Sequence, residues 1–159
     1  MTVFISHRHS DTTQALSISS YLKEHGIRTY LDVLDPESQT TDNITAVITK
    51  NIASCTHLIA VMSHDTAKSW WVPFEIGEAT ITNRRIASYR IGYSQLPEYL
   101  EHWPQMHSMK HLDLFISAYK QEKQVSTERK MFESLGTVQT DKSGADTFHR
   151  NLKNNIRFS

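Results

Sequence analysis

Apolar residues follow two different spacings along the first 91 residues of the chain. Four short runs are rich in β-branched and aromatic residues and end at polar or glycine residues, which is typical of strands. Between them, apolar residues recur every three or four positions, which is typical of amphipathic helices. The predicted strands cover residues 2–6, 27–33, 57–63 and 85–91.

The first connecting segment carries signals for both the start and the end of a helix. Ala15, Ile18 and Leu22 fall on one helical face, and Gly26 suits the position just after the last turn. Asp11 precedes this face, so we expect its carboxylate to turn inward and cap the helix by accepting hydrogen bonds from backbone N–H groups.

The second connecting segment also predicts a helix, with Asp42 as its N-terminal cap. Strands that alternate with helices over short links indicate an open, doubly wound α/β domain, in which helices cover both faces of a parallel sheet. The continuous apolar run of residues 58–62 suits the centre of that sheet. The apolar face of this second helix comprises Ile44, Val47, Ile48 and Ile52.

The pattern weakens beyond residue 91, where prolines, histidines and aromatic residues mix. We expect a fifth short strand near residues 109–112, a helix from about Leu112 and one or two amphipathic helices after it. Residues 1–120 then form the main domain, and residues 121–159 form a helical extension packed on the same domain. The last helix would carry Phe148, Leu152 and Ile156 on one side.

Composition narrows the functional classes. Seventeen basic residues balance 17 acidic ones, so charge alone predicts neither a nucleic-acid partner nor an anionic membrane. The lone Cys55 cannot form an internal disulfide, and the N-terminus lacks the apolar run of a signal peptide. No run approaches the roughly 20 apolar residues of a membrane-spanning helix. We therefore expect a cytoplasmic protein.

Polar residues follow the predicted strands at the edge where open α/β sheets bind ligands. Ser6, His7 and Arg8 lie between the first strand and a helix, which suits a phosphate group, although Arg8 could instead pair with an acidic residue. Asp35 lies in the polar loop after the second strand, and Ser63 lies at the end of the third. The pair of His7 and His9 is too small a ligand set to indicate a metal site.

The stretch "SWWVPFEIGEA", residues 69–79, surrounds Glu75 with aromatic residues. One interpretation places Trp70, Trp71 and Phe74 in the core and leaves Glu75 facing water. The other places the carboxylate of Glu75 in a pocket with an aromatic wall. Glu78, one turn further along the predicted helix, suits a solvated face.

Taken together, "VFISHRHSD", "LDVLDPES", "LIAVMS" and "SWWVPFEIGEA" resemble the Toll/interleukin-1 receptor (TIR) domain in its small bacterial form. The resemblance covers about residues 1–92. It implies a flavodoxin-like, five-stranded parallel sheet, and it places the family's BB loop at about residues 33–42.

Many members of this family cleave NAD between nicotinamide and ribose with a glutamate four residues after a tryptophan. The resemblance therefore implies that Glu75 is catalytic, that Trp71 stacks on a ring of the substrate, and that NAD is a substrate and not a cofactor. The implied substrate-binding residues are Ser6, His7, Arg8, Asp35, Ser63 and Trp71.

A chain of this kind also resembles the sensor proteins of anti-phage Thoeris systems. That resemblance implies a cyclic ADP-ribose product, assembly with other TIR subunits, a phage-derived activator and an effector reached through the diffusible product. Two other classes remain open: a non-catalytic TIR interaction module, and a nucleoside or nucleotide N-glycosidase. The pair of Trp71 and Glu75 favours an enzyme over an adaptor.

Overall fold

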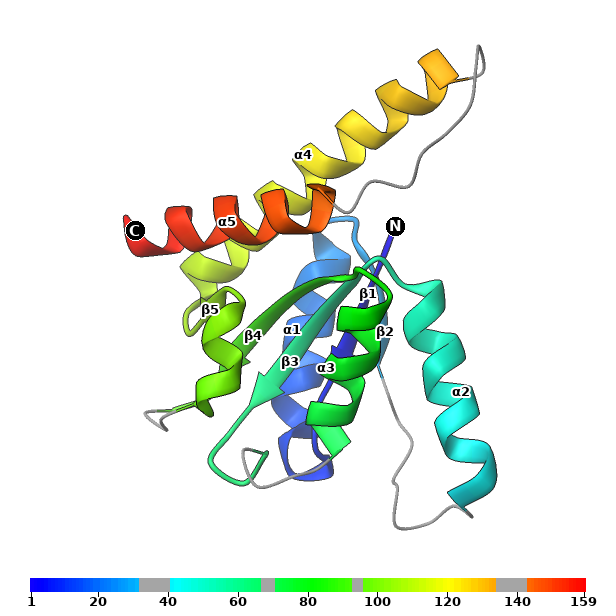
Figure 1. The fold of residues 1–159 in the computed structure, drawn as a ribbon. Coiled ribbons are helices and arrows are strands. Elements are labelled where there is room, and N and C mark those ends of the chain that lie inside the picture. The colour runs from blue at the N-terminus through cyan, green and yellow to red at the C-terminus, as the bar shows by residue number, and fades with distance from the viewer. Residues whose placement is uncertain (32–40, 67–70, 93–95, 134–142) are drawn as a thin grey trace.

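The strands form one five-stranded parallel sheet in the order β2-β1-β3-β4-β5 (Figure 1). This is the flavodoxin-like order that the resemblance implies. The computed structural model describes residues 1–31, 41–66, 71–92, 96–133 and 143–159. The strands are β1 (Thr2–Ser6), β2 (Arg28–Leu31), β3 (His57–Met62), β4 (Arg85–Arg90) and β5 (Gln105–Met106).

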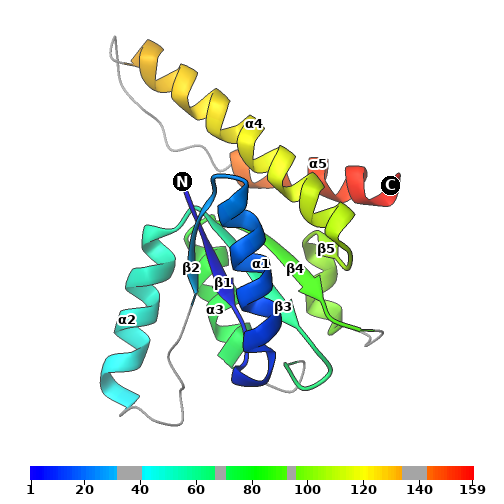
Figure 2. The ribbon, with the colours of Figure 1, turned by 180° about the vertical axis from the view of Figure 1, so that it is seen from behind.

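Helices cover both faces of this sheet, as the alternating pattern predicts. Helices α2 and α3 lie on one face, and α1 and α4 lie on the other (Figures 1 and 2). The α-helices are α1 (Thr12–Glu24), α2 (Thr41–Ser54), α3 (Trp71–Ile81), α4 (Met109–Glu133) and α5 (Ser143–Arg157), and the 3-10 turns are η1 (His9–Asp11) and η3 (Glu98–His102). Within the described residues, no helix is long and apolar enough to cross a membrane.

The fifth strand lies earlier in the chain than the sequence pattern predicts. It comprises Gln105 and Met106, whereas residues 109–112 form the first turn of α4. The hydroxyl of Ser108 accepts a hydrogen bond from the main-chain N–H of His111 at 3.3 Å, so Ser108 caps α4. Leu112, which the sequence pattern assigns to a strand, therefore belongs to the buried side of a helix, whereas Met109 is exposed.

The boundaries of α1 and α2 agree only in part with their sequence signals. Gly26 has a φ of 75°, and the N–H of Ile27 bonds to the carbonyl of Leu22, so a glycine ends α1 as predicted. Helix α2 begins at Thr41, which places Asp42 inside the helix and not at its cap. Val47 is 40% exposed, because successive residues of a helix are rotated by about 100° around its axis and the neighbouring Ile48 is the buried one.

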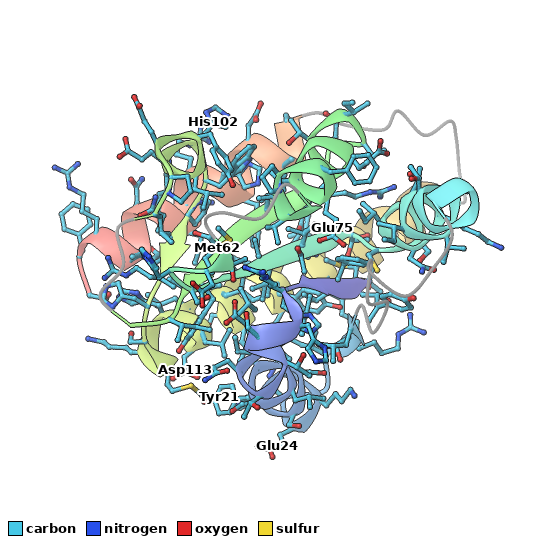
Figure 3. All side chains as sticks on the ribbon, turned by 90° about the horizontal axis from the view of Figure 1, so that it is seen from below. Tyr21, Glu24, Met62, Glu75, His102 and Asp113 are labelled. Atoms are coloured by element: carbon cyan, nitrogen blue, oxygen red, sulfur yellow. The ribbon has the colours of Figure 1, made fainter. Side chains whose placement is uncertain are left out.

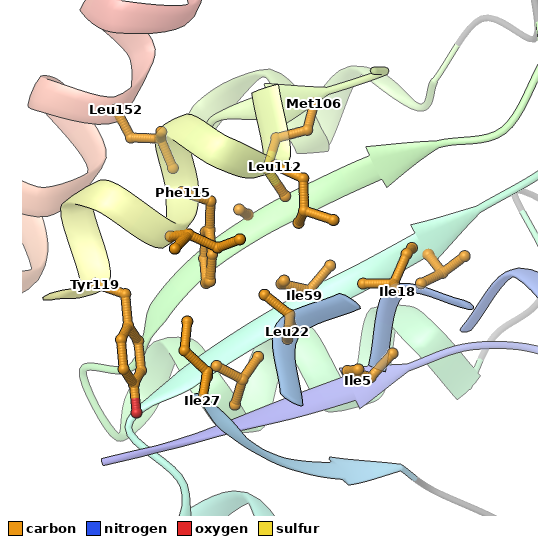
Figure 4. Packing of buried hydrophobic residues seen from close by; sticks show 14 of the residues in the cluster. Ile5, Ile18, Leu22, Ile27, Ile59, Met106, Leu112, Phe115, Tyr119 and Leu152 are labelled. Atoms are coloured by element: carbon orange, nitrogen blue, oxygen red, sulfur yellow. The ribbon is translucent and has the colours of Figure 1, made fainter. Parts of the chain in front are cut away.

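Two apolar clusters hold the helices on the sheet, one on each face. The alternation of side chains along a strand separates them: Ile59 and Val61 face α1 and α4, whereas Leu58 and Met62 face α2 and α3. Figure 4 shows the first cluster, in which α1, the sheet, α4 and α5 meet. Its labelled members are Ile5, Ile18, Leu22, Ile27, Ile59, Met106, Leu112, Phe115, Tyr119 and Leu152.

Helix α5 packs on the amino-terminal end of β4, as the amphipathic pattern indicates. Phe148 and Leu152 are buried, and Ile156 packs against the same cluster. A Cβ atom on Gly144 would lie 2.6 Å from the guanidinium of Arg85, so a glycine allows α5 to approach β4 closely. The C-terminal extension is thereby joined to the sheet at the end opposite the carboxyl termini of the strands (Figure 1).

A partly buried group of charged and polar side chains links β3, β4 and α4. Nε2 of His57 lies 3.1 Å from Oε2 of Glu122, and Arg85 donates to the other oxygen of Glu122 over 2.6 Å. Burial lowers the pKa of His57. Burial also acts to raise the pKa of Glu122, but His57 and Arg85 outweigh it, and that pKa lies below its ordinary value. A neutral histidine therefore faces a carboxylate that Arg85 neutralises.

We expect the fold to lose stability between pH 6.5 and about 4 because of His149. The N–H of Ile86 donates to Nε2 of His149 at 2.8 Å, so the bonded ring is neutral. Burial lowers its pKa to about 4, and His102 and Arg85 add to the effect while Asp146 opposes it. The unfolded chain therefore binds a proton below pH 6.5 that the folded chain does not bind.

The loss should be about 1–2 kcal/mol, because partial exposure of His149 weakens its interactions with neighbouring charges. Urea unfolding at several pH values measures it. A glutamine in place of His149 retains an acceptor and should flatten the profile across this window, whereas His9→Gln, at an exposed position, serves as the control. Equal pH slopes for wild type and His149→Gln would contradict the assignment.

Candidate active site

The strand order reverses beside β1, so the carboxyl ends of β1 and β3 mark the position where open sheets of this topology bind ligands. Figure 3 looks onto this end of the sheet, with Met62 and Glu75 labelled. Segments that follow β1 and β3 lie here together with the start of α3. The predicted site residues can be located against this edge one by one.

Glu75 lies on the buried side of α3. Its side chain is 1% exposed, and it shares that side with Val72 and Ala79, which are also buried. The hydroxyl of Ser6, at the end of β1, donates a hydrogen bond to the Glu75 carboxylate. The interpretation that leaves Glu75 facing water is therefore wrong. Pro73 occupies the first turn of α3, where it restricts the backbone just ahead of the carboxylate.

The other predicted residues are distributed around this pair. His7 is half-buried directly after Ser6, and Ser63 is half-buried after β3. Arg8 is exposed, and its Nη1 donates to the main-chain carbonyl of Asp65 at 3.1 Å. The segment after β1 is thus tied to the segment after β3.

The side chains of two predicted site residues, Asp35 and Trp71, lie outside the described part of the chain. Asp35 lies outside the described residues, as do Trp70 and most of the BB loop. Trp71 is the first residue of α3, but its side chain also lies outside the described part of the chain. The predicted stacking role of Trp71 stays a prediction.

Asp11 takes a role that the sequence pattern did not predict. Its side chain is buried as expected, but it makes no capping hydrogen bond to the backbone of α1. Its carboxylate instead accepts hydrogen bonds from the hydroxyl of Ser63, at 2.9 Å, and from the hydroxyl of Thr66. The prediction of a helix cap is wrong because these hydroxyls compete successfully for the same oxygens.

We expect Asp11→Ala to destabilise the protein by about 1–3 kcal/mol, because it leaves two inward-facing hydroxyls without their acceptor. Asp11→Asn keeps one acceptor oxygen and should cost less. Ser17→Ala, at an exposed position of α1, should change stability by less than about 0.5 kcal/mol. Urea midpoints at pH 7.5 measure all three variants, and an Asp11→Ala protein as stable as wild type would contradict this role.

Thr66 is a residue that sequence reasoning missed. It is fully buried, and its hydroxyl also lies 3.0 Å from that of Ser63. Its only local sequence signal is its place in the polar segment after a buried strand. Among the described residues, no group of three or more histidine, cysteine, aspartate or glutamate side chains is arranged to hold a metal ion.

A model of the TIR domain family matches residues 3–127, which is most of the chain. The chain belongs to the TIR domain family. The TIR match ends inside α4, so the remainder of that helix and α5 lie beyond it.

A bacterial relative of this TIR domain comes from Bacillus cereus (strain MSX-D12) and is named "Probable 3' cyclic ADP-D-ribose synthase ThsB'". The two sequences are 24% identical over 79 residues. The match covers 47% of this chain and 41% of the relative, so it spans less than half of each protein.

Two solved structures share the fold of this TIR domain. The TIR domain of the Toll-related receptor TRR-2 from Hydra magnipapillata has a TM-score of 0.53 and 21% identity, covering 65% of this chain and 81% of that one. A TIR-STING receptor from C. gigas has a TM-score of 0.54 and 22% identity, covering 72% of this chain and 38% of that one. These likenesses confirm the five-stranded parallel α/β architecture.

Proposed function

We propose that this TIR domain cleaves NAD at the bond between nicotinamide and ribose, with Glu75 as the catalytic carboxylate. The product would be a signal molecule derived from ADP-ribose, in cyclic form, and the protein would act in anti-phage defence. NAD serves as the substrate, and the reaction needs no further cofactor. The observation that carries this proposal is the buried Glu75 carboxylate, held by Ser6 at the ligand-binding edge of the sheet.

The chemistry needs a fixed negative charge beside the ribose. When the bond between ribose C1′ and the nicotinamide nitrogen breaks, its electron pair leaves with nicotinamide, which becomes neutral. The positive charge develops on the ribose, as in glycoside hydrolysis. A carboxylate already in place stabilises this charge more in the transition state than in the ground state.

A nucleophile then completes the reaction on the ribose. Attack by water gives ADP-ribose and releases one proton. Attack by a nucleophilic atom of the substrate itself gives a cyclic product and also releases one proton. Exclusion of water from the pocket favours the cyclic route, and a carboxylate as enclosed as Glu75 suits such a pocket.

Two further features support the proposal. The Ser6 hydroxyl orients the Glu75 carboxylate from a strand, and strands position such groups more rigidly than loops do. The bonds of Asp11 to Ser63 and Thr66 fix the segment that leads toward α3. The partial similarity to a protein named as a probable 3' cyclic ADP-D-ribose synthase favours a cyclic product. We further propose that activation involves assembly with other copies of the chain in the cytoplasm, in response to a phage-derived signal.

Incubation of the full chain with NAD tests this function. Nicotinamide and the ADP-ribose product are followed by liquid chromatography and mass spectrometry. The protein concentration is raised until copies of the chain assemble. Parallel reactions contain nucleoside monophosphates. Release of nicotinamide supports the proposal, release of a nucleobase assigns an N-glycosidase, and a chain that assembles without consuming either substrate is an interaction module.

A further inference from the structure

A second charged group reaches the same edge of the sheet from β4. Arg90 is the last residue of β4, and it pairs with Met62, the last residue of β3. Alternation along the strands places Arg90 on the same face as Ile86, which packs with Met62 in the cluster beneath α2 and α3. Arg90 therefore lies on the face of the sheet that carries Glu75.

The register of the strands relates Arg90 to Ser6. Ser6 pairs with Ala60 on β3, and Met62, two residues further along β3, pairs with Arg90. The origin of the Arg90 side chain thus lies about 10 Å across the sheet from that of Ser6, and one side-chain repeat further toward the carboxyl edge. Glu75 reaches Ser6 from the helix above this face.

Arg90 differs from the neighbouring arginines in its contacts. Arg85 pairs with Glu122, Arg84 donates to the carbonyl of Ala53, and Arg8 donates to the carbonyl of Asp65. Within the described residues, Nε of Arg90 is buried and has no hydrogen-bond partner. The residue as a whole is only half-buried.

We propose that Arg90 binds the diphosphate of the substrate while Glu75 faces the ribose of the scissile bond. A guanidinium group binds phosphate oxygens through parallel N–H donors, which suits this ligand better than a point charge does. A diphosphate that bound near the buried Glu75 carboxylate would be repelled by it, and a fixed cation on the same face offsets that repulsion. One sugar and its methylene group separate the two positions in a dinucleotide, which fits the spacing across the strands.

This inference rests on the proposed function only for the identity of the substrate, and binding tests it without turnover. The probe is ADP-ribose, titrated into the full chain by calorimetry, with adenosine as the ligand that lacks phosphate. We expect Arg90→Gln to weaken ADP-ribose binding about ten- to hundredfold and to leave adenosine binding unchanged. Arg90→Lys should restore part of the loss, because it returns the charge without the planar donors.

Arg84→Gln is the matched control, because Arg84 also has a buried Nε but directly precedes β4, beyond the strand end opposite Arg90. It should bind ADP-ribose as wild type does. The inference is overturned if Arg90→Gln binds ADP-ribose with wild-type affinity, or if its affinities for adenosine and ADP-ribose fall equally. It is also overturned if Arg8→Gln weakens ADP-ribose binding and Arg90→Gln does not, or if the wild-type chain does not bind ADP-ribose. Melting curves of all variants identify any loss that comes from unfolding.

The outcome separates the two proposals. If the chain binds ADP-ribose through Arg90 but leaves NAD intact, the proposed function is refuted and the inference stands. If the wild-type chain releases nicotinamide, and Arg90→Gln shows the same kinetics and the same affinity for ADP-ribose, the proposed function stands and the inference is refuted. If both hold, the half-saturating NAD concentration should rise in Arg90→Gln more than the maximal rate falls, because the diphosphate is bound alike in ground and transition states.

Discussion

Replacement of Glu75 by glutamine should reduce nicotinamide release by at least about 10²- to 10³-fold, which is the scale for losing one preorganised electrostatic group. The substitution keeps the shape of the side chain and removes the charge that stabilises the developing ribose cation. The Ser6 hydroxyl can still donate to the amide oxygen, so the helix and its packing should persist. The loss should therefore fall on the maximal rate and not on stability.

Glu78→Gln is the control for this experiment. Glu78 lies three residues further along α3 and is only half-buried, so the same chemical change there should leave the rate near that of wild type. Nicotinamide release is measured for both variants in the assembled state, beside circular dichroism spectra and urea midpoints. A folded Glu75→Gln protein that still releases nicotinamide at a substantial fraction of the wild-type rate would refute the catalytic role of Glu75.

Replacement of Leu152 by alanine should cost about 2–5 kcal/mol of unfolding free energy, which is the usual range for a fully buried leucine. Leu152 is 0% exposed and joins the cluster that α1, the sheet and α4 share. Because this cluster is continuous, we expect α5 to unfold together with the sheet in one transition. The effect would place the C-terminal extension in the same cooperative unit as the active-site edge.

Asn151→Ala provides the comparison for Leu152→Ala. Asn151 precedes Leu152 on α5 and is exposed, so its loss should change stability by less than about 0.5 kcal/mol. Urea unfolding is followed by far-ultraviolet circular dichroism and by tryptophan fluorescence. Two separated transitions in the wild-type chain, or a Leu152→Ala protein within 1 kcal/mol of wild type, would show that α5 is not part of the main folded unit.

Local periodicity was a sound guide to the sheet but a poor guide near its last strand. The first four strands extend over four to six residues, so their runs of β-branched and apolar residues are visible in the sequence. β5 has only two residues, which is too short for any alternation, and the cap that starts α4 follows it at once. A short edge strand is defined by its neighbour, here β4, and the sequence does not show that pairing.

The residues of the site divide in the same way. Glu75 and Ser6 could be named from their positions after strands and from the family pattern. Arg90 was missed because an arginine at a strand end carries no motif, and only the register of β3 and β4 shows which face it occupies. Asp11 was identified as an inward-facing group, but with the wrong partners.

The sequence by itself determined the alternation of strands and helices, the end of α1 at Gly26, the amphipathic face of α5 and the place of Glu75 on the third helix. These features depend on residues within a few positions of one another. The tertiary structure alone decided that Ser6 bonds to Glu75, that Asp11 bonds to Thr66, and that Glu122 lies beside His57. Each of these pairs joins residues more than 50 positions apart, and the order of the strands, which local spacing does not encode, brings them together.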